Sequence, residues 1–220
     1  MADQEAASYA PSPRTSPTRH ADRAAYDRET VHAVLDAEYI CHLGFVADGD
    51  PVVLPTLYAR VGERLYLHGS TGGRPLRNAR EGLRVCVTVT LVDGVVLARS
   101  AMHHSLNYRS VVAHGLARRV TDPAEHRAAL DALLDAPFPG RAGDCRPPTA
   151  KELAQTAVLR LDLEEVSAKT RSGGVSEEPE DAGLPYWAGV VPARRAYGSP
   201  EPDTGGVPAA LPDYLRALPS

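Results

Sequence analysis

The chain has 220 residues, a length that fits one domain with flexible ends or two small domains. Its formal net charge is −4, so no broad basic surface is expected, which argues against nucleic acid as the main partner. No apolar run approaches the roughly 20 residues that a membrane helix needs, and the N-terminus lacks the apolar segment of a signal peptide. We therefore expect a cytoplasmic protein with reduced cysteines, of which Cys41 and Cys86 lie in apolar surroundings typical of a core.

Both ends of the chain are predicted to be flexible tails. Residues 1–23 are rich in Ala, Ser, Pro and Arg, and residues 198–220 are rich in Pro and Gly. The folded domain is therefore expected at residues 24–197. It begins with a helix capped by Asp27. The next segment, residues 39–69, is typical of an antiparallel meander whose strands are separated by glycine-containing turns.

The second half of the domain is predicted to add more strands and one strong helix. Residues 83–92 (LRVCVTVTLV) form the clearest strand, and Asp93-Gly94 predicts a tight hairpin after it. A further strand is expected at 110–120, a helix at 124–136 and an alternating strand from about residue 157. Most connections are too short for the crossover helices of a parallel sheet. We therefore predict a mainly β, α+β fold with an antiparallel sheet and few helices; periodicity leaves open whether the sheet closes into a barrel.

A strand-to-helix segment at residues 67–74 (LHGSTGGR) is the first candidate site. Ser70 and Thr71 offer hydroxyl donors, and Arg74 offers a pair of N–H groups suited to a phosphate. The helix expected to begin near Pro75 adds free N–H groups and a partial positive charge. Together these features predict an anion cradle. The alternative is a glycine-rich loop with a solvated arginine, because neither known phosphate-loop spacing is present.

Two later segments are also candidates. Residues 102–110 (MHHSLNYRS) are polar and aromatic, and they predict substrate or cofactor contact or else an ordinary polar loop. His103 and His104 lack the spacing and the neighbouring carboxylates of a metal site, so no metal is predicted. Trp187, the only tryptophan, either plugs the end of the core or forms an apolar wall for a planar ring. No recognisable nucleophile is present, so any catalysis is expected to depend on a bound cofactor.

Several segments, taken in order, resemble the flavin-nucleotide-binding branch of the pyridoxamine 5′-phosphate oxidase-like superfamily, which includes the nitroimidazole-resistance proteins. The segments are 42–46 (HLGFV), 52–56 (VVLPT), 65–70 (LYLHGS), 73–74 (GR), 84–88 (RVCVT), 104–112 (HSLNYRSVV), 165–169 (EVSAK) and 187–192 (WAGVVP). The resemblance covers about residues 27–197. It implies an antiparallel split β-barrel that forms a homodimer and binds flavin mononucleotide (FMN) at the subunit interface.

The resemblance also implies roles for individual residues. Those implied to line the isoalloxazine ring are Val53, Leu54, Pro55 and Thr56. Those implied to hold the phosphate side of FMN are His68, Gly69, Ser70 and Arg74. Ser110 takes the position of a flavin-contacting glutamine of the oxidase branch, and Trp187 is implied to cover the flavin or the dimer cleft.

The implied function is an FMN-dependent oxidoreductase that passes hydride through flavin N5 to or from a small organic molecule, with His68 or Tyr108 as proton donor. Pyridoxamine 5′-phosphate is not the expected substrate, because residues 52–57 (VVLPTL) replace the oxidase's Arg and Lys, and only Arg194-Arg195 lies where the oxidase has an Arg-Leu-His cluster. The alternatives are a non-catalytic flavin-binding or storage protein, or a barrel that uses deazaflavin or haem. Against haem, no isolated histidine stands out as an axial ligand.

Overall fold

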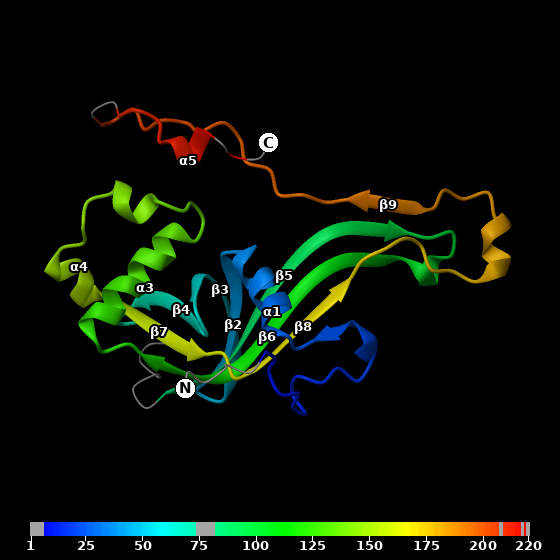
Figure 1. Ribbon diagram of the computed structural model, residues 1–220, viewed down its shortest axis with the longest axis horizontal. Coiled ribbons are helices and arrows are strands. Elements are labelled where there is room, and N and C mark those ends of the chain that lie inside the picture. Colours follow the sequence, from blue (N-terminus) through cyan, green and yellow to red (C-terminus); the bar gives the residue numbers. More distant parts are fainter. Residues whose placement is uncertain (1–6, 74–81, 207–208, 217, 219–220) are drawn as a thin grey trace.

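The centre of the computed structural model is a ring of six antiparallel strands in the order β6-β7-β4-β3-β2-β5, closed where β5 pairs with β6 (Figure 1). The structure describes residues 7–73, 82–206, 209–216 and 218. The strands are β1 (Ala24–Ala25), β2 (Ile40–Ala47), β3 (Asp50–Val61), β4 (Arg64–Ser70), β5 (Leu83–Leu97), β6 (Ser105–Arg119), β7 (Thr156–Asp162), β8 (Glu165–Arg171) and β9 (Gly189–Pro192). The α-helices are α1 (Arg28–Asp36), α3 (Pro123–Asp135), α4 (Ala150–Gln155) and α5 (Asp213–Arg216). The predicted antiparallel split-barrel fold is confirmed.

The interior of the ring is filled mainly by Val, Leu and Ala side chains. Strand residues alternate between the two faces, so Leu65 and Leu67 of β4 point inward opposite Leu161 and Leu159 of β7. All four are at most 2% exposed. Cys41 belongs to the same core, as predicted, and its burial raises the pKa of the thiol to about 12.

The helices cover the ring from outside and begin where the sequence predicts. Asp27 caps α1 by accepting a hydrogen bond from the Thr30 amide. The helix α3 packs over β4, where Tyr66, Val120, Ala129 and Val158 form a second, smaller apolar cluster. The strand β4 is therefore covered on both faces, by the barrel interior on one side and by α3 on the other.

The hairpin predicted at Asp93-Gly94 is wrong. The strand β5 continues through these residues to Leu97, and its register against β6 shifts between Val92 and Gly94. The Asp93 carboxylate accepts hydrogen bonds of 2.9 and 2.8 Å from Arg109 of β6. This cross-strand ion pair holds a typical turn sequence in a bulged strand.

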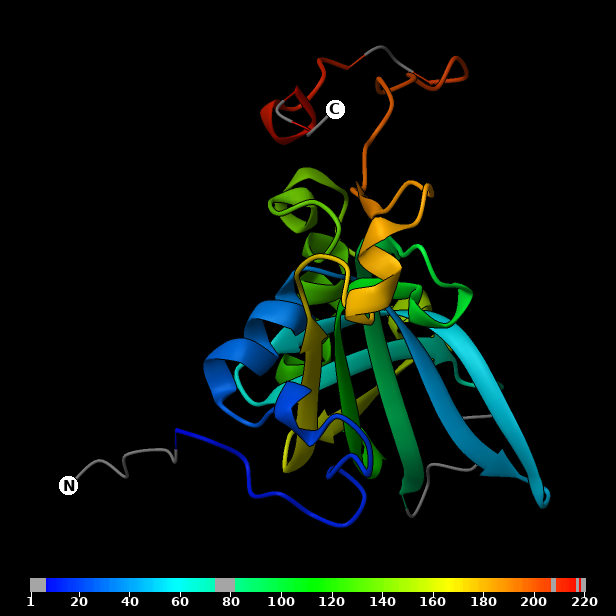
Figure 2. The same cartoon turned by 90° about the vertical axis from the view of Figure 1, so that its right-hand side faces the viewer.

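Beyond the ring, the C-terminal end of β5 and the N-terminal end of β6 project together, and β9 pairs along β5 (Figure 1). We call this extension, residues 92–97, 105–108 and 187–192, the arm. The segment before α1 also contacts the domain: Tyr9 is buried, and its hydroxyl donates to Glu63 at 2.7 Å. After β9 the chain runs outside the ring to α5, where Tyr214 donates to Asp144 at 2.9 Å (Figure 2). Within the described residues, no helix has the length and apolar character needed to cross a bilayer.

Candidate functional site

Two cavities meet at the end of β4, and His68 lines both of them. Leu67 faces the barrel interior, so the next residue, His68, faces outward on the same side as Tyr66. Its partner in the register with β7 is Val158, a member of the outer apolar cluster. The His68 ring makes no hydrogen bond or ion pair with any residue that the structure describes, and an imidazole is a common ligand of metal ions.

The inner cavity has a volume of about 240 Å³ and opens at the end of the barrel. It is lined by Leu43, Leu54, Pro55, Thr56, Leu67, His68, Gly69, Ser70, Gly73 and Leu159. The structure thus brings six of the predicted flavin-binding residues together, from Leu54 to Thr56 on β3 and from His68 to Ser70 on β4. Val53 is not among the lining residues, and its side chain is 64% exposed.

The turn after β4 supplies part of the predicted anion cradle. The Thr71 amide donates to the Gln155 carbonyl at 3.1 Å and the Gly73 amide to the Ser70 carbonyl at 2.7 Å, so both already have partners. The Gly72 amide lies 3.4 Å from Ser70 Oγ, which is a long hydrogen bond. The Gly72 amide and two hydroxyls are therefore what the described turn offers to an anion. Arg74 and the helix expected at Pro75 lie outside the described residues.

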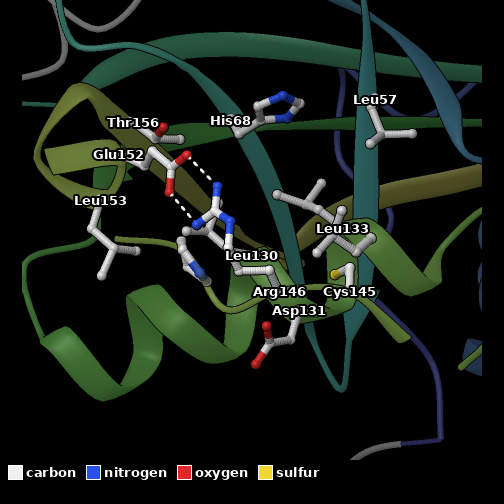
Figure 3. A pocket seen from close by; sticks show the side chains of 12 residues that line it. Leu57, His68, Leu130, Asp131, Leu133, Cys145, Arg146, Glu152, Leu153 and Thr156 are labelled. Atoms are coloured by element: carbon white, nitrogen blue, oxygen red, sulfur yellow. Dashed lines mark hydrogen bonds and ion pairs between the residues drawn. The ribbon is translucent and has the colours of Figure 1, made fainter. Parts of the chain in front are cut away.

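The outer cavity, of about 350 Å³, lies between β4, α3 and α4 (Figure 3). Its lining is Leu57, His68, Leu130, Asp131, Leu133, Leu134, Cys145, Arg146, Pro148, Glu152, Leu153 and Thr156. Half of these residues are leucine or proline, and His68 is the one imidazole among them. An apolar cavity with a few convergent polar groups is the usual form of a small-molecule site.

An ion pair at the rim of the outer cavity joins Arg146 to Glu152, as the dashed lines in Figure 3 show. Arg146 donates to the two Glu152 oxygens at 3.0 and 2.7 Å. Glu152 also accepts from the Thr149 amide at 2.6 Å, which completes a capping box at the start of α4. Hydrogen bonds from Arg146 and then from Thr149 lower the pKa of Glu152 to about 2, so this carboxylate stays charged at neutral pH.

Three predicted site residues lie away from both cavities of the single chain. The Ser110 hydroxyl donates to the Lys169 carbonyl at 3.1 Å, on the far side of β6 from the inner cavity's strands. Tyr108 pairs with Val92 and Arg171 on the arm. Trp187 is 66% exposed beside Gly189, so the expectation that it plugs the core is wrong.

The outer cavity was not predicted from the sequence. The sequence of α3 does contain an indication of this cavity. Leu130 and Leu134 extend the apolar face of the helix beyond Ala129 and Leu133, which are buried against the sheet. Cys145, whose role the sequence leaves undetermined, also lines this cavity.

Comparisons with known proteins agree with this architecture. The family pattern described as pyridoxamine 5′-phosphate oxidase matches residues 27–170. The flavocytochrome Anf3 from Azotobacter vinelandii is 40% identical, with a TM-score of 0.89, and the match covers 96% of this chain and 98% of that one. The FAD and heme binding protein from Mycobacterium smegmatis is 38% identical, with a TM-score of 0.84 over 90% of this chain and 97% of its own.

A more distant structure shares the fold alone. It is a protein from Bacteroides thetaiotaomicron described as a candidate for 5-nitroimidazole antibiotic resistance, and it is 19% identical with a TM-score of 0.56 over 66% of this chain and 85% of its own. The comparison with curated proteins gave no match.

Proposed function

This chain belongs to the pyridoxamine 5′-phosphate oxidase family, and from that premise we propose that it is a redox protein that holds a flavin in the inner cavity and haem in the outer one. The carrying observation is that two adjacent cavities share His68, whose ring has no partner within the described residues. Relatives of 40% and 38% identity, described as a flavocytochrome and as an FAD and heme binding protein, support two cofactors.

The inner cavity fits part of a flavin nucleotide. Leu54 and Pro55 supply an apolar wall for a planar ring, and the hydroxyl of Ser70 supplies a donor for a phosphate. At about 240 Å³ the cavity is smaller than most small-molecule sites, so the rest of the nucleotide would lie beyond it. The sequence predicts FMN, but the Mycobacterium smegmatis relative is described as an FAD binder, and we propose FAD for this chain.

The outer cavity fits haem in the chemistry of its walls. Leucines from β3, α3 and α4 provide the apolar surface that a porphyrin ring requires, and His68 provides an imidazole, a common haem iron ligand. A bound flavin would supply hydride or single-electron transfer, and haem would supply single-electron transfer. We therefore propose an oxidoreductase activity in which His68 binds the iron and the inner cavity orients the flavin.

The absorbance spectrum of the protein as purified tests this function. We expect a flavin band together with a Soret band, and mass spectrometry of the released ligands is expected to give the mass of FAD. Release of FMN would support the sequence-based prediction instead. A colourless protein that takes up neither flavin nor haem on titration would refute the proposal.

A homodimer is the proposed assembly, because the arm exposes apolar side chains that a monomer leaves in water. These side chains are Val92, Val95, Leu106, Trp187 and Val191. A second subunit packed on the arm would also bring Tyr108, Ser110 and Trp187 toward a neighbour's cavity, as the family resemblance implies.

Replacing Trp187 by Glu is expected to weaken this dimer at least about 30-fold, since a tryptophan at an interface commonly contributes 2 kcal/mol or more. Sedimentation velocity over a dilution series measures the change. Val61→Glu is the matched control, because Val61 is also an exposed apolar residue but lies at the β3–β4 turn, away from the arm. A wild-type chain that sediments as a monomer at all concentrations would contradict the dimer.

A further inference from the structure

The rim of the outer cavity carries a guanidinium that neither iron ligation nor the apolar walls explain. Both hydrogens of Arg146 Nη1 are used, by the Pro147 carbonyl at 2.8 Å and by Glu152 at 3.0 Å. One hydrogen of Nη2 binds the other Glu152 oxygen at 2.7 Å. The N–H at Nε and the second N–H of Nη2 make no hydrogen bond within the described part of the chain.

These two free donors lie on one edge of the guanidinium and form a fork that matches a carboxylate. Figure 3 shows the two contacts between the guanidinium and Glu152, which involve Nη1 and Nη2 and not Nε. Glu152 binds the adjacent edge, formed by Nη1 and Nη2, and the hydrogen bonds from Thr149 fix Glu152 itself at the start of α4. The fork is therefore held in place by its neighbours before any ligand arrives, which lowers the entropy lost on binding.

Haem has the complementary chemistry, since it combines an apolar ring with two carboxylate side chains. The leucines of the outer cavity fit the ring, His68 fits the iron, and a carboxylate at the rim requires a cationic partner. Resting on the proposed function, we propose that Arg146 binds a carboxylate of the haem through its Nε and Nη2 hydrogens. Glu152 acts as the positioning residue that orients the guanidinium.

The exposure of Arg146 to solvent decides how much its hydrogen bonds can add to the affinity for haem. The Arg146 side chain is 65% exposed, so solvent screens its charge and a buried-pair energy does not apply. A charge-assisted hydrogen bond at such a site corresponds to roughly a tenfold change in affinity. The effect is large enough to measure, and it depends on the ligand's carboxylate rather than on its ring.

The test compares two probes, iron protoporphyrin IX and its dimethyl ester, which differ only in whether the carboxylates are free. The full chain, saturated with flavin and prepared from haem-depleted cells, is titrated with each probe while the Soret band is followed. Wild type is expected to bind the free acid about tenfold more tightly than the diester. Arg146→Gln is expected to reduce this preference to within about twofold, without moving the Soret maximum of the bound form.

Arg119→Gln is the matched control, because it removes the same charge from an exposed position of β6, and Arg119 does not line the cavity. It should keep the full preference for the free acid. A wild type that does not discriminate, or an Arg146→Gln variant that still prefers the free acid tenfold, would overturn the role of Arg146 while leaving haem binding intact. If wild type takes up neither porphyrin, the haem part of the proposed function fails, and this inference fails with it.

Discussion

The His68→Ala variant is expected to lose its haem while it keeps its flavin. His68 is the imidazole that lines the outer cavity, and removal of an iron ligand is expected to weaken haem binding by more than about 100-fold. The inner cavity keeps its other walls, Leu54 to Thr56 and Ser70 among them, so flavin content should change little. The ratios of Soret and flavin absorbance to protein concentration, measured on the purified variant, check both halves of this expectation.

His104→Ala is the control, since the His104 ring lines neither cavity and, within the described residues, hydrogen-bonds only with the Ser100 carbonyl at 3.2 Å. Free imidazole added to His68→Ala should restore the Soret band, because the cavity left by the side chain admits it. A variant with full haem content would show that another residue binds the iron. A variant that loses flavin and keeps haem would place His68 in the flavin site, as the sequence predicts.

Leu161→Ala is expected to lower the free energy of unfolding by about 3 kcal/mol, because it removes a buried leucine and leaves a cavity in a core that cannot fully collapse. Leu161 is 1% exposed and fills the space above Gly115 of β6, where an added Cβ would lie 2.6 Å from its Cδ1 atom. Denaturant unfolding of variants in one and the same cofactor state measures the loss, since a bound ligand would raise the apparent stability.

Gly115→Ala supplies the other side of a double-mutant cycle. In the wild-type background its methyl group collides with Leu161, and we expect a cost of about 1 kcal/mol. In the Leu161→Ala background the collision is gone, so the same change should cost close to nothing. Additive effects in the cycle would show that these two residues are not in contact.

Local signals were enough to predict most of the fold. The alternation and turns of residues 39–69 predicted β2, β3 and β4, the Asp27 cap marked the start of α1, and the helix predicted at 124–136 corresponds to α3. The prediction of a hairpin at Asp93-Gly94 was wrong because the conformation of these residues depends on Arg109, a residue of the neighbouring strand. Ring closure could not be predicted, since it depends on the register between β5 and β6 and not on any single strand.

The two cavities also differ in how far each could be predicted from the sequence. The inner one is built from two short runs on paired strands, 54–56 and 67–70, so a continuous sequence pattern marks it. The outer one gathers Leu57, His68, three leucines of α3, Arg146 and Leu153, which are far apart in the sequence. His68 was singled out from the sequence, but the outer cavity beside its ring is formed only when α3 and α4 pack next to β4 and β7.

The position of β4 between two cavities makes the pairing register with β7 decide what each site contains. His68 lies opposite Val158 on the side of β4 that faces α3, and Leu67 lies opposite Leu159 on the side that faces the barrel interior. A slip of a single residue would turn the imidazole into the barrel and an aliphatic side chain toward α3. The register of β4 therefore decides which side chain faces α3 and which faces the barrel interior, and the turn at Gly62 that leads into β4 precedes this choice in the chain.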